Sequence, residues 1–218
     1  MIHRGLLFGG LGLLCWGIGG MIWMYYTIFQ NIVLPYPSVT DIFYLPSTLF
    51  YSLGVIYFAR ASGSELKFKN TPERLFVVTS TVIISIISYY FLVTIARGGK
   101  LFDSEYSPLE NFLNIAYPCM DFVGLTIAVL VSGLSFKYII PKYKIALMAL
   151  TCGLVIMFIS DSLLNYLIIH GKYYNGCLSD LSFVFGVSLL IFGVLGFCSE
   201  REKQTEHKIH AFEFLKYR

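Results

Sequence analysis

The chain has 218 residues and a formal net charge of +3, and 56% of its residues are hydrophobic while only 13% are charged. With a mean hydropathy of +0.70, it carries far more apolar surface than one soluble core could bury. The composition therefore predicts an integral, multi-pass protein of the cell membrane, in contact with the lipid bilayer. The basic residues lie between apolar runs and form no continuous patch, which argues against a nucleic-acid partner.

Six apolar runs are long enough to supply the roughly 20 helical residues that cross a bilayer core about 30 Å thick. They cover residues 5–29, 41–59, 75–96, 112–136, 145–169 and 178–198. We expect an all-α polytopic membrane protein with six transmembrane helices arranged as three hairpins and both termini in the cytoplasm. Residues 1–198 then form the transmembrane domain, and residues 199–218 form a short cytoplasmic tail. The first run has no small-x-small cleavage site before Gln30, so it is expected to remain as an uncleaved span.

The lysines and arginines predict the orientation. With both termini inside, only Arg97, Lys100 and Lys172 lie on the outer side. The other thirteen lie on the cytoplasmic side: Arg4, Arg60, Lys67, Lys69, Arg74, Lys137, Lys142, Lys144, Arg201, Lys203, Lys208, Lys216 and Arg218. The positive-inside rule favours this topology.

The first span has small residues at a regular spacing. Gly10 and Gly17 are seven residues apart, as are Gly12 and Gly19 and the two tryptophans of the chain. This spacing predicts a small-residue face that allows close helix packing.

The third and fourth spans each leave an alternative open. Thr81, Ser85 and Ser88 form a hydroxyl stripe, which indicates either hydrogen bonds between helices or part of a polar path. Pro118 falls about two turns into the fourth run, so the regular helix could instead begin near Pro118. Residues 109–116 would then be a re-entrant or interfacial piece on the outer side.

Three spans begin with a turn-forming stretch followed by an aspartate. YPSVTD ends at Asp41, YPCMD ends at Asp121 and NGCLSD ends at Asp180. A carboxylate in the first turn stabilises the free N–H groups of a helix, and Ser38 with Asp41 has the spacing of a capping box. Helix capping alone accounts for all three aspartates.

A fourth aspartate needs a different explanation. Asp161 lies inside the fifth span about two turns from its outer end, with Asn165 one turn further along the same face. An ionisable group at that depth is costly unless it faces a polar cavity or a partner. In one interpretation Asp161 is hydrogen-bonded to neighbouring helices through Asn165, Ser160 or Ser162. In the other, all four carboxylates converge on an outer pocket for a cation, a proton or a basic small molecule.

Neither the cysteines nor the histidines form a known site pattern. The five cysteines include no C-x-x-C pair, so no metal site, cofactor or disulfide framework is expected. Cys119 and Cys177 each precede an outer aspartate and could pair in an oxidising compartment.

No catalytic motif is present, so we do not expect an enzyme.

The first hairpin carries a family resemblance. It resembles the start of the multi-helix membrane sensor regions at the N-termini of bacterial and archaeal diguanylate cyclases, phosphodiesterases and histidine kinases. Those regions combine a Trp-rich first helix, a Pro-x-Pro-Ser-x-x-Asp start of the second helix and a later Tyr-Pro-x-x-Asp. The matching residues are Trp16, Trp23, Pro35, Pro37, Ser38, Asp41, Tyr44, Leu45, Tyr117, Pro118 and Asp121.

This resemblance implies a receptor-like or sensor-like module. No output domain follows the sixth span, so signalling would require a separate cytoplasmic partner. The candidate ligand-binding residues are Asp41, Asp121, Asp161, Asp180, Asn165 and Tyr44. Two other classes remain open. One is a small transporter or channel for a cation, a proton or a basic solute, with the hydroxyl stripe as its path. The other is a membrane scaffold or assembly subunit in which the aspartates are purely structural.

Overall fold

The computed structural model describes residues 1–33, 36–63, 71–95, 99, 106–135 and 139–216. Within these residues every element is a helix, and six helices are long and apolar enough to cross a membrane. The predicted all-α class with six apolar spans is therefore confirmed. Seven residues used in the predictions above lie outside the described ranges: Pro35, Lys67, Lys69, Arg97, Lys100, Lys137 and Arg218.

The six helices follow the hydrophobic runs closely. They are α1 (Ile2–Phe29), α2 (Asp41–Ala61), α3 (Thr71–Ser88), α4 (Pro108–Ser135), α5 (Pro141–Ile169) and α6 (Leu178–Lys216). The end of α3 continues as a π-helical segment, η1 (Tyr89–Ile95).

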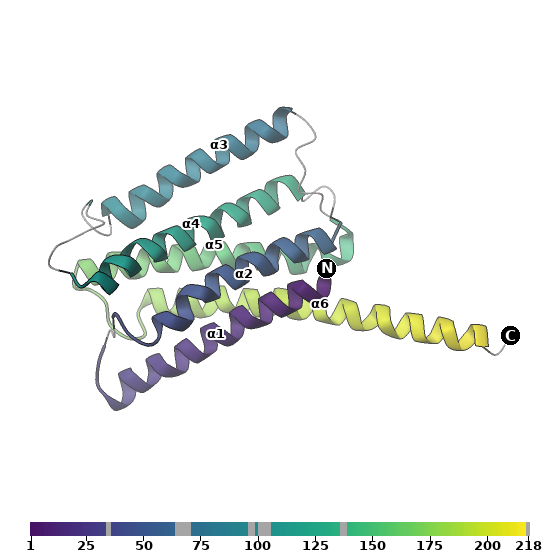
Figure 1. Cartoon of the computed structure of the whole chain (residues 1–218), viewed down its shortest axis with the longest axis horizontal. Helices are drawn as coiled ribbons and strands as arrows, with labels where there is room; N and C mark the ends of the chain where they lie inside the picture. Colours follow the sequence, from purple (N-terminus) through teal and green to yellow (C-terminus); the bar gives the residue numbers. More distant parts are fainter. Residues whose placement is uncertain (34–35, 64–70, 96–98, 100–105, 136–138, 217–218) are drawn as a thin grey trace.

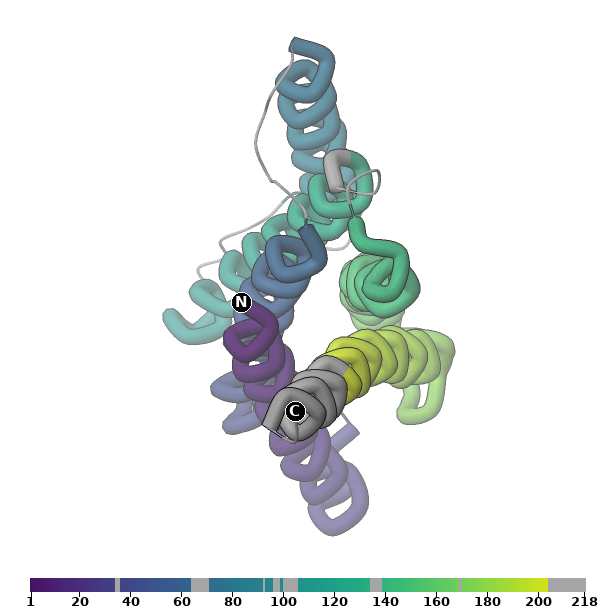
Figure 2. The backbone as a smooth tube through the Cα atoms, turned by 90° about the vertical axis from the view of Figure 1, so that its right-hand side faces the viewer, coloured from purple at the N-terminus to yellow at the C-terminus, as the bar shows by residue number. Residues whose placement is uncertain are grey.

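Two helix pairs and a bridging helix make up the bundle (Figure 1). α1 packs along α2 and α5 packs along α6, while α4 contacts both α2 and α5. α3 packs mainly on α4 and stands at the edge of the bundle, as Figure 2 shows. The centre of the bundle is therefore formed by α2, α4 and α5, which contact one another.

Glycines set the close approach of α1 to α2. A Cβ atom on Gly54 would lie 3.0 Å from the backbone nitrogen of Gly9, so the two backbones touch at this crossing. The predicted small-residue face is only partly correct. Gly12 and Gly19 pack against tyrosine rings of α2, whereas Gly10 and Gly17 face open space. One of the two predicted series is therefore on the packing face, where Gly5, Gly12 and Gly19 recur every seven residues and Gly9 is buried beside them.

The two ends of the bundle differ in charge. α2, α4 and α6 begin at the end where α1 and α5 finish (Figure 1), and we call it the acidic end because Asp41 and Asp180 lie in first helical turns there. We call the opposite end, where the N-terminus lies, the basic end. The helix ends there carry Arg4, Arg60, Arg74, Lys142 and Lys144, and Arg201 lies one turn beyond Phe197, which stacks on Tyr143 at the same end.

Toward the basic end the bundle is filled by an apolar core. Three rings from α2, α5 and α6 stack in its centre: Phe58 and Phe197 have ring centroids 4.2 Å apart, and Tyr143 and Phe197 have centroids 5.0 Å apart. Leu147 and Leu190 are almost completely buried beside them. This half of the bundle is closed by side-chain packing.

The start of α4 corrects one alternative drawn from the sequence. The helix begins at Pro108 and runs without interruption through Pro118. A capping box fixes its start, because the Ser107 N–H donates to Glu110 Oε2 at 2.7 Å and the Glu110 N–H donates to Ser107 Oγ at 3.2 Å. A start near Pro118, with residues 109–116 as a re-entrant piece, is therefore wrong.

The end of α6 also differs from the prediction. The apolar run ends near Cys198, but α6 continues as one helix to Lys216. Residues 199–216 are thus an extension of the last span, directed away from the bundle beyond the basic end (Figure 1).

Candidate functional site

Asp41, the first residue of α2, binds the segment before the helix and also links α2 to α4. Its Oδ2 accepts the Ser38 N–H at 2.7 Å, as the capping-box spacing predicts. Its Oδ1 accepts the Tyr117 hydroxyl at 2.6 Å, across the helix interface. Asp41 is only 8% exposed, so both hydrogen bonds are sheltered from competing water. A short O–H···O bond to a carboxylate is among the stronger hydrogen bonds in proteins.

A second hydrogen bond joins the segment before α2 to α4. The Tyr36 hydroxyl donates to Asn114 Oδ1 at 2.9 Å. Asn114 lies about one helical turn before Tyr117, so the 36–41 segment follows the first half of α4 over two successive contacts. The two stretches that carry the family resemblance, around Asp41 and around Tyr117, therefore touch.

Asp121 and Asp161 form a pair between α4 and α5. Asp121 lies well inside α4 and is 5% exposed, so the expectation that it caps a helix is wrong. Its carboxyl group lies within hydrogen-bonding reach of that of Asp161. Two carboxylate anions have no proton to donate, so a hydrogen bond between them requires one of them to be protonated.

The partners expected for Asp161 within its own helix do not contact its carboxyl group. Asn165 Nδ2 donates to the backbone carbonyl of Asp161 at 2.8 Å. Ser160 and Ser162 donate to backbone carbonyls one turn earlier in α5. The interpretation in which these three residues satisfy the Asp161 side chain is therefore wrong, and the partner is Asp121.

Asp180 caps α6, as the sequence predicts. Its Oδ2 accepts the Gly176 N–H at 2.7 Å and its Oδ1 lies 3.4 Å from the Tyr173 hydroxyl, which points toward it as donor. Burial, followed by the negative charge of Asp180, raises the pKa of the Tyr173 phenol. Tyr173 therefore stays a neutral donor to Asp180 at physiological pH.

Two tyrosines connect three of the aspartates at the acidic end, and Asp121 joins them through its contact with Asp161. Tyr117 lies within electrostatic range of Asp41 and Asp161. Tyr44, on α2, lies within range of Asp41 and Asp180. The four carboxyl groups thus form a chain across α2, α4, α5 and α6.

Aromatic packing holds Tyr44 in place. Its ring lies between Trp16 and Trp23 of α1, with centroid distances of 6.0 and 6.4 Å. Gly19 provides the space, since a Cβ there would lie 2.7 Å from the Tyr44 ring. The tryptophans of the first helix therefore position a residue of the acidic end.

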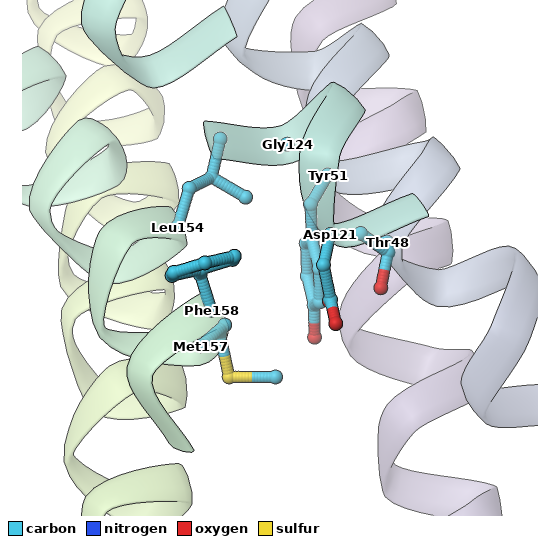
Figure 3. A pocket seen from close by; sticks show the side chains of 7 residues that line it. All are labelled: Thr48, Tyr51, Asp121, Gly124, Leu154, Met157 and Phe158. Atoms are coloured by element: carbon cyan, nitrogen blue, oxygen red, sulfur yellow. The ribbon is translucent and has the colours of Figure 1, made fainter. Parts of the chain in front are cut away.

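A small cavity lies between α2, α4 and α5 (Figure 3). Seven residues line it: Thr48, Tyr51, Asp121, Gly124, Leu154, Met157 and Phe158. It offers about 10 Å³ to a water-sized molecule, which is about the space that a single water needs. In this conformation the cavity has no room for an organic ligand.

Two hydroxyls of α2 are buried without a hydrogen-bond partner among the described residues. They belong to Tyr51 and Ser52, which are 3% and 2% exposed. Figure 3 shows the Tyr51 hydroxyl and the Asp121 carboxyl pointing the same way along one wall of the cavity. The opposite wall, formed by α5, is apolar.

The predicted hydroxyl stripe of the third span is only partly buried. Ser85 is exposed and donates to the Thr81 backbone carbonyl at 2.8 Å. Only Ser88 is buried. Cys119 and Cys177, for which the sequence leaves a pairing open, are both free thiols, with Cys119 exposed and Cys177 buried beside Ser179.

The sequence contained signals for residues that the predictions missed. Thr48, Tyr51 and Ser52 recur at three- and four-residue spacing in an otherwise apolar helix, which indicates one polar face. Tyr117 belongs to the Tyr-Pro-x-x-Asp stretch, but only the folded arrangement identifies its partner as Asp41.

Comparisons with family models, with curated proteins and with solved structures found no match. The functional proposal below therefore rests on the geometry and chemistry of the chain itself.

Proposed function

We propose that the protein is a sensor-like, multi-pass module of the cell membrane whose acidic end faces outward and whose signal passes to a separate cytoplasmic partner. In this proposal the six spans form three hairpins with both termini in the cytoplasm. The observation that carries the proposal is the hydrogen bond from Tyr117 to Asp41, one helical turn from the Asp121–Asp161 pair. These contacts tie α2, α4 and α5 together through groups whose charge depends on protons or cations.

The charge distribution supports the proposed orientation. The described basic residues concentrate at the basic end, and the positive-inside rule assigns such an end to the cytoplasm. The aspartates then face the outside, where an external ligand could reach them.

Packing supports a sensor over a transporter. The stacked rings of Phe58, Tyr143 and Phe197 fill the bundle toward the basic end, and Ser85 of the hydroxyl stripe on α3 is exposed and donates within its own helix. A transporter needs a polar route that opens to both sides in turn. A sensor needs only a shift in helix packing that a partner can detect.

α6 is the element best placed to transmit that shift. It begins next to Asp180 at the acidic end and continues as one helix to Lys216 beyond the basic end. A small rotation or displacement of α6 at its start would therefore reach the segment accessible to a cytoplasmic partner.

The proposal is tested by measuring helix movement in lipid nanodiscs. Spin labels replace Arg60 on α2 and Arg201 on α6, in a background whose native cysteines are changed to serine or alanine. We expect the distance between the labels to change when the pH or the cation on the outer side is varied, and Tyr117→Phe to reduce the change. A label distance that stays constant under all these conditions, together with ion flux in proteoliposomes, would contradict the sensor and favour transport.

A further inference from the structure

We propose that the Asp121–Asp161 pair, together with the Tyr51 hydroxyl and one water in the adjoining cavity, forms a binding site for a proton. This inference names the ligand of the proposed sensor and rests on that function for its signalling consequence. The site itself can be tested separately.

The pair already has the geometry of a shared proton. The carboxyl groups of Asp121 from α4 and Asp161 from α5 lie within hydrogen-bonding reach of each other, and two carboxyl groups in contact are stabilised when they share one proton and one negative charge. Release of that proton to water on the outer side leaves two carboxylates in contact. Like charges in a poorly hydrated interior repel strongly, so loss of the proton pushes α4 and α5 apart at this level.

The cavity beside the pair has room for one water molecule that can bind both Tyr51 and Asp121. The Tyr51 hydroxyl is 3% exposed, lines the cavity with Asp121 and has no hydrogen-bond partner among the described residues. One water fits there, and it can accept a hydrogen bond from Tyr51 while donating one to Asp121. A metal cation in the same place would leave the Tyr51 O–H without an acceptor. The space is also too small for a basic organic solute.

The surroundings contribute negative or neutral groups. The titratable groups that approach the site from α2, α4 and α6 are Asp41, Asp180, Tyr44, Tyr51 and Tyr117.

Two further titratable groups lie near these residues: Cys15 of α1 is within electrostatic range of Tyr51, and Tyr36 is within range of Tyr117. Tyr89 and Tyr90 of η1 are exposed, and so is His170 at the end of α5. Lys142 and Lys144 lie at the other end of α5, more than four turns from Asp161. None of these lysines or exposed groups contacts the pair. The net charge of the pair therefore changes when it binds or releases a proton.

Infrared difference spectroscopy of the full chain in nanodiscs tests the site. A protonated carboxylic acid in an apolar setting has a C=O stretch that is well separated from the carboxylate bands. We expect the wild-type protein to show such a band, to lose it as the pH rises, and to lack it in Asp121→Asn and Asp161→Asn. Asp180→Asn is the matched control, because Asp180 lies outside the pair and its carboxylate accepts the Gly176 N–H at the start of α6, so the band should persist.

Tyr51→Phe tests the cavity water and keeps the ring volume. Without the hydroxyl the water loses its anchor, and the ionised form of Asp121 loses a hydrogen bond. We expect the proton affinity of the site to rise about tenfold, the change that one hydrogen bond to a charged group produces. If either Asn variant does not fold, the wild-type titration and Tyr51→Phe still decide the question.

The outcomes separate the site from the proposed function. A wild-type protein with no carboxylic acid band at any pH at which it is folded would overturn the proton site, as would a band that survives both Asn substitutions. A band that titrates while the Arg60–Arg201 label distance stays constant supports the proton site and contradicts the sensor. A distance that changes without any such band supports the sensor with a different ligand.

Discussion

Removal of the Tyr117 hydroxyl tests the contact that joins α2 to α4. Tyr117→Phe keeps the ring and deletes only the donor that lies 2.6 Å from Asp41 Oδ1. Asp41 keeps its second hydrogen bond, to the Ser38 N–H, so the start of α2 should stay bound to the segment before it. The effect therefore reports on the interhelical bond alone.

The size of the effect follows from the setting of the bond. Side-chain hydrogen bonds between membrane helices contribute about 0.6 kcal/mol on average and up to about 1.7 kcal/mol. A bond to an ionised acceptor is roughly twice as strong as a neutral one. We therefore expect Tyr117→Phe to lower the free energy of unfolding by about 1 to 2 kcal/mol.

Tyr36→Phe is the matched control. It deletes the other tyrosine hydroxyl that joins the 36–41 segment to α4, but this bond has a neutral acceptor, Asn114, and Tyr36 is 37% exposed. We expect a loss of about 0.6 kcal/mol or less. Equilibrium unfolding in mixed lipid–detergent micelles, monitored by tryptophan fluorescence and by circular dichroism, measures both variants. Equal losses for the two variants, or a loss below about 0.5 kcal/mol for Tyr117→Phe, would refute the reasoning.

Two further predictions concern the glycine face of α1. Gly54→Ala places a Cβ 3.0 Å from the Gly9 backbone nitrogen and should lower the free energy of unfolding by about 1 to 3 kcal/mol. Gly10→Ala is the control, because its Cβ meets open space, and it should be neutral or slightly stabilising. Equal losses of stability for the two variants would contradict the packing. Gly19→Ala should displace the Tyr44 ring from Trp16 and Trp23. Because these are the only tryptophans in the chain, the intrinsic fluorescence spectrum should shift, and an unchanged spectrum would show that Tyr44 is held by other contacts.

Local signals in the sequence predicted the helices and two of the hydrogen bonds at their starts. A run of about 20 apolar residues has few alternatives to a spanning helix, and Ser38 with Asp41 encodes its own hydrogen bond through a three-residue spacing. Pro118 misled the prediction because proline breaks an isolated helix, whereas a helix packed among others tolerates it. The capping box of Ser107 and Glu110 was the stronger signal for where α4 begins.

The pairing of side chains from different helices could not be predicted in the same way. Asp121 and Asp161 are forty residues apart in sequence, and their contact depends on the rotation of α4 and α5 about their own axes. That rotation is decided by packing along the whole length of both helices. The same holds for Tyr117 and Asp41, where the sequence supplied both residues but not their hydrogen bond.

The central claim is that the proton content of the acidic end controls the position of α6. The most direct measurement is the pH dependence of the distance between spin labels at Arg60 and Arg201 in nanodiscs. The account predicts a change in distance with the same midpoint as the loss of the carboxylic acid band, and a shift of that midpoint to higher pH in Tyr51→Phe. A distance that is constant over the whole pH range in which the protein stays folded would contradict it.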